Sequence, residues 1–126
     1  KFISLANKVS MDNKIPVFFI EKENTQLIEK VRNQIPGAIF PEENSKLSCP
    51  ALVTALASRL NSVITIDNGI MHMISIANIP MIILFGPTNS DKFAPKNNFV
   101  KVLDSKKIYN TKDINAITVD DVFNLI

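Results

Sequence analysis

The sequence has 126 residues, of which 46% are hydrophobic and 21% charged, and its net charge is +2. This length and balance predict one folded domain of common size and exclude a disordered or fibrous chain. The lysines are spread along the whole length, so the charge pattern argues against a nucleic-acid-binding surface.

Cysteine content and hydropathy narrow the class further. Cys49 is the single cysteine, which excludes an internal disulfide and a multi-cysteine metal site and indicates a reducing compartment. The longest apolar run, residues 79–85, is far shorter than the roughly 20 residues of a membrane helix. We therefore expect a cytoplasmic protein without a transmembrane segment.

The first part of the chain predicts two helices and two short strands. An apolar helical face starts at Phe2, which predicts a helix at once and indicates a chain that begins inside a longer protein. Residues 15–20 are a continuous apolar run, typical of a strand buried on both faces. Residues 22–34 predict a polar helix that is ended by Gly37, and residues 38–40 predict a second strand.

The rest of the chain alternates strands with helices. The expected elements are a helix capped by Ser48 and running to Leu60, a strand over 63–66, a helix over 70–77, a strand over 81–85, a turn-rich loop over 86–98, a strand over 99–103 and a last helix begun by the capping box Thr118-Val119-Asp120-Asp121. This alternation predicts an α/β fold, a Rossmann-like parallel sheet with helices on both faces, as a single domain over residues 1–126.

Four of the residues that follow the strand 63–66 suggest a ligand-binding site. In open parallel sheets, ligands bind beyond the carboxyl ends of the strands, and the next helix begins here with free N–H groups that suit phosphate. Gly69 lets the backbone approach a ligand, His72 could donate to a phosphate oxygen, and Asp67 could accept hydrogen bonds from sugar hydroxyls. Taken singly, these residues and Asn68 fit structural roles better, as a helix cap, a turn residue and a half-buried histidine. Together at a strand end they favour a site.

The segment Phe-Gly-Pro-Thr-Asn-Ser at residues 85–90 follows the next strand and should open onto the same crevice. Thr88, Ser90 and the backbone of Gly86 could supply hydrogen-bond donors, and a plain Gly-Pro turn is an equal alternative. The three glycines form neither G-x-G-x-x-G nor a Walker loop, which argues against dinucleotide oxidoreductases and P-loop NTPases.

A longer motif resembles a known family. The run consists of Asp67-x-Gly69-x-x-His72, Ala77-x-x-Pro80, Leu84-Phe85-Gly86-Pro87-Thr88 and Pro95. It resembles the carboxyl-terminal domain of glycosyltransferase family 9, the ADP-heptose:lipopolysaccharide heptosyltransferases. Three positions depart from the family wording: Asn68 stands for Ser or Thr, Ile70 for a frequent Pro, and Phe93 for Trp.

The resemblance implies the carboxyl-terminal half of a GT-B glycosyltransferase, which holds most of the nucleotide sugar. By position, Asp67 would bind hydroxyls of the donor sugar, and Asn68, Gly69 and His72 would hold the diphosphate. The family's general base, its acceptor-binding groups and a phosphate-binding lysine would lie on residues outside this sequence. We therefore assign no catalytic residue here and expect the isolated chain to be inactive.

The same resemblance places the adenosine near Glu23 and Ser48, although Glu23 fits a solvated acid in a first helical turn better. No cofactor and no metal are implied.

The implied function is donor binding in an inverting transfer of heptose from ADP-heptose to the lipopolysaccharide core, with an amino-terminal domain that binds the acceptor. This chemistry would take place at the inner face of the bacterial inner membrane. The alternatives are a GT-B transferase that uses another sugar nucleotide, a non-catalytic nucleotide-binding module, and a structural α/β domain in which Asp67-Asn68-Gly69 is only a helix cap.

Overall fold

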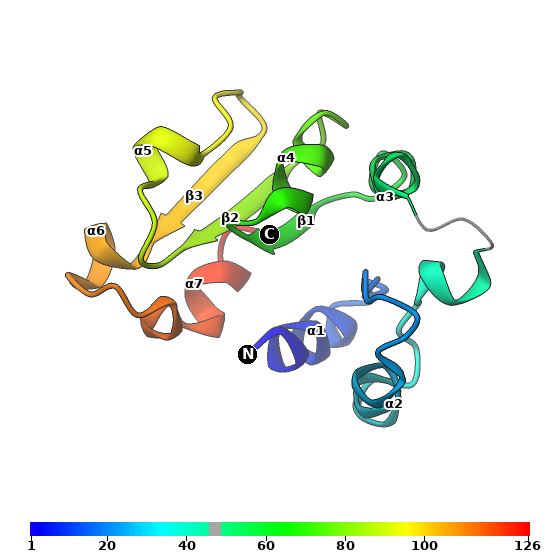
Figure 1. The fold of residues 1–126 in the computed structure, drawn as a ribbon. Helices are drawn as coiled ribbons and strands as arrows, with labels where there is room; N and C mark the ends of the chain where they lie inside the picture. Colours follow the sequence, from blue (N-terminus) through cyan, green and yellow to red (C-terminus); the bar gives the residue numbers. More distant parts are fainter. Residues whose placement is uncertain (46–48) are drawn as a thin grey trace. The chain divides into compact units, whose positions relative to one another are not determined.

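The computed structural model describes residues 1–45 and 49–126 (Figure 1). They form two compact units, Lys1–Cys49 and Pro50–Ile126. The single domain expected over residues 1–126 stays a prediction. Within the described residues, no helix has the length and apolar character needed to cross a membrane.

The first unit is built on two helices and their shared core. Its helices are α1 (Phe2–Met11), α2 (Thr25–Gln34) and the 3-10 helix η1 (Pro41–Asn44). Its buried core consists of Ala6, Ile28, Val31, Ile35 and Phe40. The helix expected over 22–34 begins three residues late, because the Asn24 side chain accepts from the Leu27 N–H at 3.3 Å and so caps it.

The two strands predicted in this unit are reduced to a single parallel bridge between Val17 and Ile39. The segments do run side by side, since the Phe18 N–H donates to the Ile39 carbonyl and the Ile39 N–H to the Pro16 carbonyl, both at 2.9 Å. The expectation of two full strands was wrong. Pro16 has no N–H to donate, and Pro36 and Pro41 flank the second segment, so few donors remain for a ladder.

The second unit contains a parallel sheet of three strands. They are β1 (Val63–Ile66), β2 (Met81–Phe85) and β3 (Val100–Asp104), in the order β1-β2-β3. Met81 pairs with Val63 on one side and with Val100 on the other. The central strand β2 is buried at every position except Leu84, which is half-buried, as expected for a strand covered on both faces.

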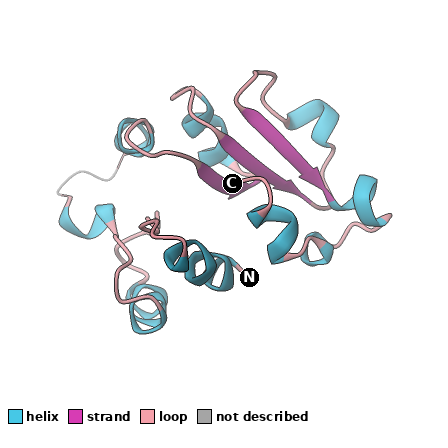
Figure 2. Cartoon of the chain, turned by 180° about the vertical axis from the view of Figure 1, so that it is seen from behind, coloured by secondary structure: helices cyan, strands magenta, loops and turns pink. Residues whose placement is uncertain are grey.

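The helices of this unit cover both faces of the sheet. They are α3 (Pro50–Ala57), α4 (Gly69–Ser75), α5 (Ser90–Phe93), α6 (Ser105–Tyr109), η2 (Ile114–Ala116) and α7 (Val119–Phe123). Figures 1 and 2 show α4 and α5 on one side of the sheet and α7 on the other. The predicted α/β architecture with a parallel sheet and helices on both faces is confirmed.

Three short helices of this unit, α5, α6 and η2, were not predicted. Helix α5 lies inside the expected loop 86–98, where the Asn89 side chain accepts from the N–H groups of Asp91 and Lys92 at 3.0 and 3.3 Å. Helix α6 begins at the end of β3 and stops at Asn110, whose φ of 53° is left-handed. The capping box that starts α7 is confirmed, since Thr118 and Asp121 exchange both of its hydrogen bonds.

Candidate functional site

The carboxyl edge of the three-stranded sheet gathers most of the predicted site residues. All three strands run in the same direction, so the segments after β1, β2 and β3 leave the sheet at one edge. The N–H of Asp67 donates to the Leu84 carbonyl at 3.3 Å, which continues the β1–β2 ladder one residue past β1. The Asp67 backbone is therefore fixed beside the end of β2.

Two side chains at this edge are available to a ligand. Asp67 is half-buried after β1, and His72 is exposed on α4. Among the described residues, neither the Asp67 carboxylate nor the His72 imidazole has a hydrogen-bond or ion-pair partner. A ligand that covers this carboxylate removes water from it, which is costly, so a ligand that donates hydrogen bonds to it has an advantage.

Asn68 has the structural role that the sequence left open. Its Oδ1 accepts from the Met71 N–H at 2.9 Å, and its backbone is extended, with φ of −157°. Asn68 is thus the N-cap of α4. Its backbone, and not its capping oxygen, remains for the predicted diphosphate contact.

Gly69 is not required by the conformation of the chain. It is exposed at the first position of α4, and its φ is not positive. A Cβ atom built there would meet no protein atom within 4 Å. The space beside Gly69 is therefore open, as a close approach by a ligand would need.

Gly86 is buried, and packing explains why it is a glycine. A Cβ atom on it would lie 2.9 Å from Cβ of Ile114 and 3.1 Å from the Lys112 carbonyl oxygen. Thr88, two residues later, is exposed, and its carbonyl accepts a hydrogen bond from Nζ of Lys106. The hydrogen bonds that Gly86 and Thr88 are predicted to donate to the nucleotide sugar stay predictions.

Asp104, which ends β3 at the same edge, was not predicted from the sequence. Ser90 Oγ donates to its Oδ2 at 2.6 Å, and the Lys106 N–H donates to its Oδ1 at 2.9 Å. Burial raises the pKa of Asp104, but these hydrogen bonds and the charges of Lys106 and Lys107 outweigh it and lower the pKa below its ordinary value. One signal could have found it: like Asp67, Asp104 is an acid that directly follows a strand expected from the sequence, here the strand over 99–103.

The two residues predicted beside the adenosine, Glu23 and Ser48, precede the strands of the sheet in the sequence. Glu23 is exposed in the first unit. Burial, and then the charges of Glu21 and Glu23, raise the pKa of Glu42, so these acids are close neighbours. Ser48 lies outside the described residues, and the adenosine contact stays a prediction for both.

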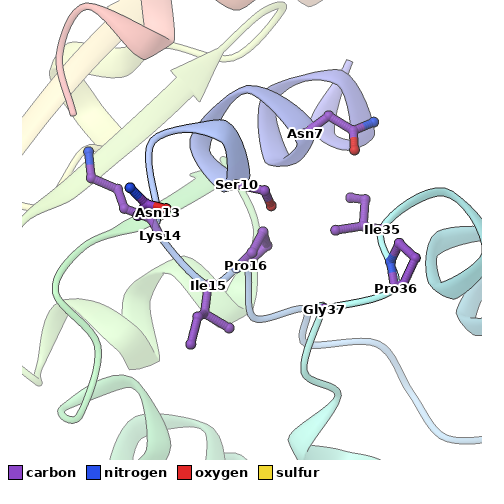
Figure 3. A pocket seen from close by; sticks show the side chains of 9 residues that line it. All are labelled: Asn7, Ser10, Asn13, Lys14, Ile15, Pro16, Ile35, Pro36 and Gly37. Atoms are coloured by element: carbon purple, nitrogen blue, oxygen red, sulfur yellow. The ribbon is translucent and has the colours of Figure 1, made fainter.

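A separate pocket of about 350 Å³ lies within the first unit (Figure 3). Its polar lining consists of Asn7, Ser10, Asn13 and Lys14. Among the residues that the structure describes, none of the predicted site residues lines this pocket. In the part of the chain that the structure describes, no group of three or more His, Cys, Asp or Glu side chains is placed to hold a metal ion.

Comparison with known proteins gave one match to a solved structure and one to a family model. The crystal structure of the glycosyl transferase family 9 from Veillonella parvula DSM 2008 is similar with a TM-score of 0.79 and 22% identity. The match covers 98% of this chain but 38% of that one, and it shows a shared fold. No curated protein matches the sequence. The family model of glycosyltransferase family 9 (heptosyltransferase) matches residues 38–120, which include the whole carboxyl edge of the sheet. The chain belongs to glycosyltransferase family 9, the heptosyltransferase family.

Proposed function

We propose that this chain is the donor-binding part of an inverting glycosyltransferase that transfers heptose from ADP-heptose to the lipopolysaccharide core. One observation carries the proposal. The residues that match the family model include a sheet edge where the Asp67 carboxylate and the His72 imidazole have no partner among the described residues.

Each free group suits one part of a nucleotide sugar. The Asp67 carboxylate accepts hydrogen bonds, and sugar hydroxyls donate them. The His72 ring donates to an anionic oxygen of the diphosphate, and this hydrogen bond is stronger when the ring is charged. His72 lies on α4 and Asp67 just before it, so the sugar and the diphosphate would bind on adjacent parts of one short segment.

The backbone of the same segment supports this arrangement. Asn68 fixes the start of α4, and the open space at Gly69 admits an oxygen of the donor close to the main chain. The exposed Thr88 hydroxyl after β2 offers a further donor at the same edge.

The chemistry divides between this chain and the longer protein that we propose contains it. An inverting transfer needs a base to deprotonate the acceptor hydroxyl and positive or hydrogen-bonding groups to stabilise the departing diphosphate. The residues at the carboxyl edge supply some of the groups that stabilise the departing diphosphate. The base and the acceptor site are assigned to the rest of the protein, since the chain spans 38% of the similar solved chain. The reaction would occur at the inner face of the inner membrane.

A transfer assay tests this function. The protein at its natural full length would be incubated with a heptose-free lipopolysaccharide core and either ADP-heptose or UDP-glucose. The proposal expects ADP release that depends on both the core and ADP-heptose. Release of UDP from the other mixture would support a GT-B transferase with a different donor, and binding of ADP-heptose without any transfer would support a non-catalytic module.

A further inference from the structure

The loop after β2 is attached to the end of β3 by a buried hydrogen bond. Ser90, at the start of α5, and Asp104, at the end of β3, are each 3% exposed, and their side chains are joined at 2.6 Å. Fourteen residues separate them in sequence, and the β2–β3 pairing, which sets Phe85 opposite Asp104, brings them together.

A second contact crosses the same gap. Asp104 accepts from the Lys106 N–H at 2.9 Å, and the Lys106 side chain in turn donates to the Thr88 carbonyl. The loop over residues 86–89 is therefore held by two contacts, one at Thr88 within it and one at Ser90 directly after it. Asp104 accepts the hydrogen bond from Ser90, and Lys106, whose N–H Asp104 also accepts, donates to Thr88.

We propose that Asp104 is a positioning residue that holds the loop 86–89 in the conformation that binds the nucleotide-sugar donor. This inference rests on the proposed function, which assigns Thr88 to that donor. Asp104 touches no ligand itself and acts through Ser90 and Lys106.

The chemistry of the pair favours positioning over stability alone. A buried carboxylate loses solvation, and an apolar residue of similar volume often stabilises a core at least as well. A fully hydrogen-bonded buried group does, however, specify one conformation. The lowered pKa of Asp104 keeps the carboxylate ionised at neutral pH, when it accepts both hydrogen bonds.

The structure offers two matched controls. Asp91 and Lys107 form an ion pair of 2.5 Å between α5 and α6, next to the Ser90–Asp104 hydrogen bond in sequence, but their side chains are 76% and 55% exposed. Exposed pairs contribute little, so Asp91→Ala removes an acid without freeing the loop. Val122→Ala opens a cavity in α7, where Val122 is 3% exposed, and lowers stability without removing a hydrogen bond of Asp104.

The test measures donor binding on the protein at its natural full length. Titration calorimetry with ADP-heptose would compare Asp104→Ala, Ser90→Ala and the double variant with the two controls. We expect Ser90→Ala to raise the Kd about tenfold and Asp104→Ala to raise it at least as much, because Asp104→Ala also loses the hydrogen bond from the Lys106 N–H. The double variant should bind no more weakly than Asp104→Ala, since the Ser90–Asp104 hydrogen bond is already lost there. Asp104→Asn should retain most of the affinity, since the amide oxygen can accept from the Lys106 N–H and the amide NH2 can donate to the Ser90 Oγ. Asp91→Ala and Val122→Ala should leave the Kd unchanged.

Hydrogen exchange measures the protection of the loop amides in the absence of ligand. In Asp104→Ala we expect faster exchange at the amides of residues 86–89, apart from Pro87, and unchanged protection in β1. Loop amides that exchange as in the wild type would overturn the positioning role. A wild type that binds ADP-heptose while Asp104→Ala and Ser90→Ala bind it equally well would overturn this inference alone. A wild type that binds neither ADP nor ADP-heptose would overturn the proposed function and this inference with it.

Discussion

Gly86 and Ile114 are packed so closely that a methyl group on Gly86 would lie 2.9 Å from the Cβ atom of Ile114. The Lys112 carbonyl oxygen, 3.1 Å from the same point, is backbone and has little freedom to move. We therefore expect Gly86→Ala to lower the free energy of unfolding by about 1–3 kcal/mol. Urea unfolding of the wild type and variant measures this, and equal midpoints would contradict the packing.

Gly69 is the matched glycine with the opposite expectation. Its Cβ would meet no protein atom within 4 Å and its φ is not positive, so Gly69→Ala should leave stability unchanged or raise it by about 0.4–1 kcal/mol. The added methyl would occupy space that we assign to the donor. Calorimetry should thus show weaker ADP binding by a protein that is no less stable, and unaltered ADP affinity would argue against a close approach at Gly69.

The cap of α4 gives a third prediction. Asn68→Ala removes the acceptor of the Met71 N–H and should cost about 1 kcal/mol of stability. Asn68→Ser keeps a capping oxygen and should restore most of this loss. Thermal unfolding of both variants decides the matter: if serine destabilises as much as alanine, the capping oxygen is not what Asn68 contributes.

Acid unfolding tests the hydrogen bonds of Asp104. Its pKa in the folded protein is lowered from the ordinary value of 3.8, so its ionised form contributes stability that is present above that value. The contribution is lost as the pH falls through the lower folded pKa. Asp104→Asn lacks this titration, and its Tm should therefore fall less steeply below about pH 4 than that of the wild type. Parallel Tm curves from pH 7 to pH 2.5 would be inconsistent with a lowered pKa.

The sequence predicts those elements that carry a long pattern or a clear cap. Strand β2 is a continuous apolar run, and the Thr118–Asp121 capping box marks α7. It does not predict α5 or α6, because helices of four and five residues have no apolar period and depend on the caps Asn89 and Asp104. It overestimates the strands of the first unit, where prolines remove the donors that a ladder needs.

The same division holds at the site. That Asp67 and Gly69 follow a strand end can be read from the alternation of strands and helices alone. The Ser90–Asp104 hydrogen bond could not be read from the sequence, because it depends on the register in which Phe85 faces Asp104 across β2 and β3. Strand β2 is apolar throughout, so it has no alternation of polar and apolar residues from which the register could be read.

The most direct test of donor binding at the carboxyl edge is titration calorimetry with ADP and with ADP-heptose on the protein at its natural full length. The wild type, Asp67→Ala and His72→Ala would be compared. Saturable binding is predicted for the wild type, with Asp67→Ala weakened for ADP-heptose only and His72→Ala weakened for both ligands. If the wild type binds neither ligand, or if both variants bind ADP-heptose as the wild type does, Asp67-Asn68-Gly69 is a helix cap and no donor site.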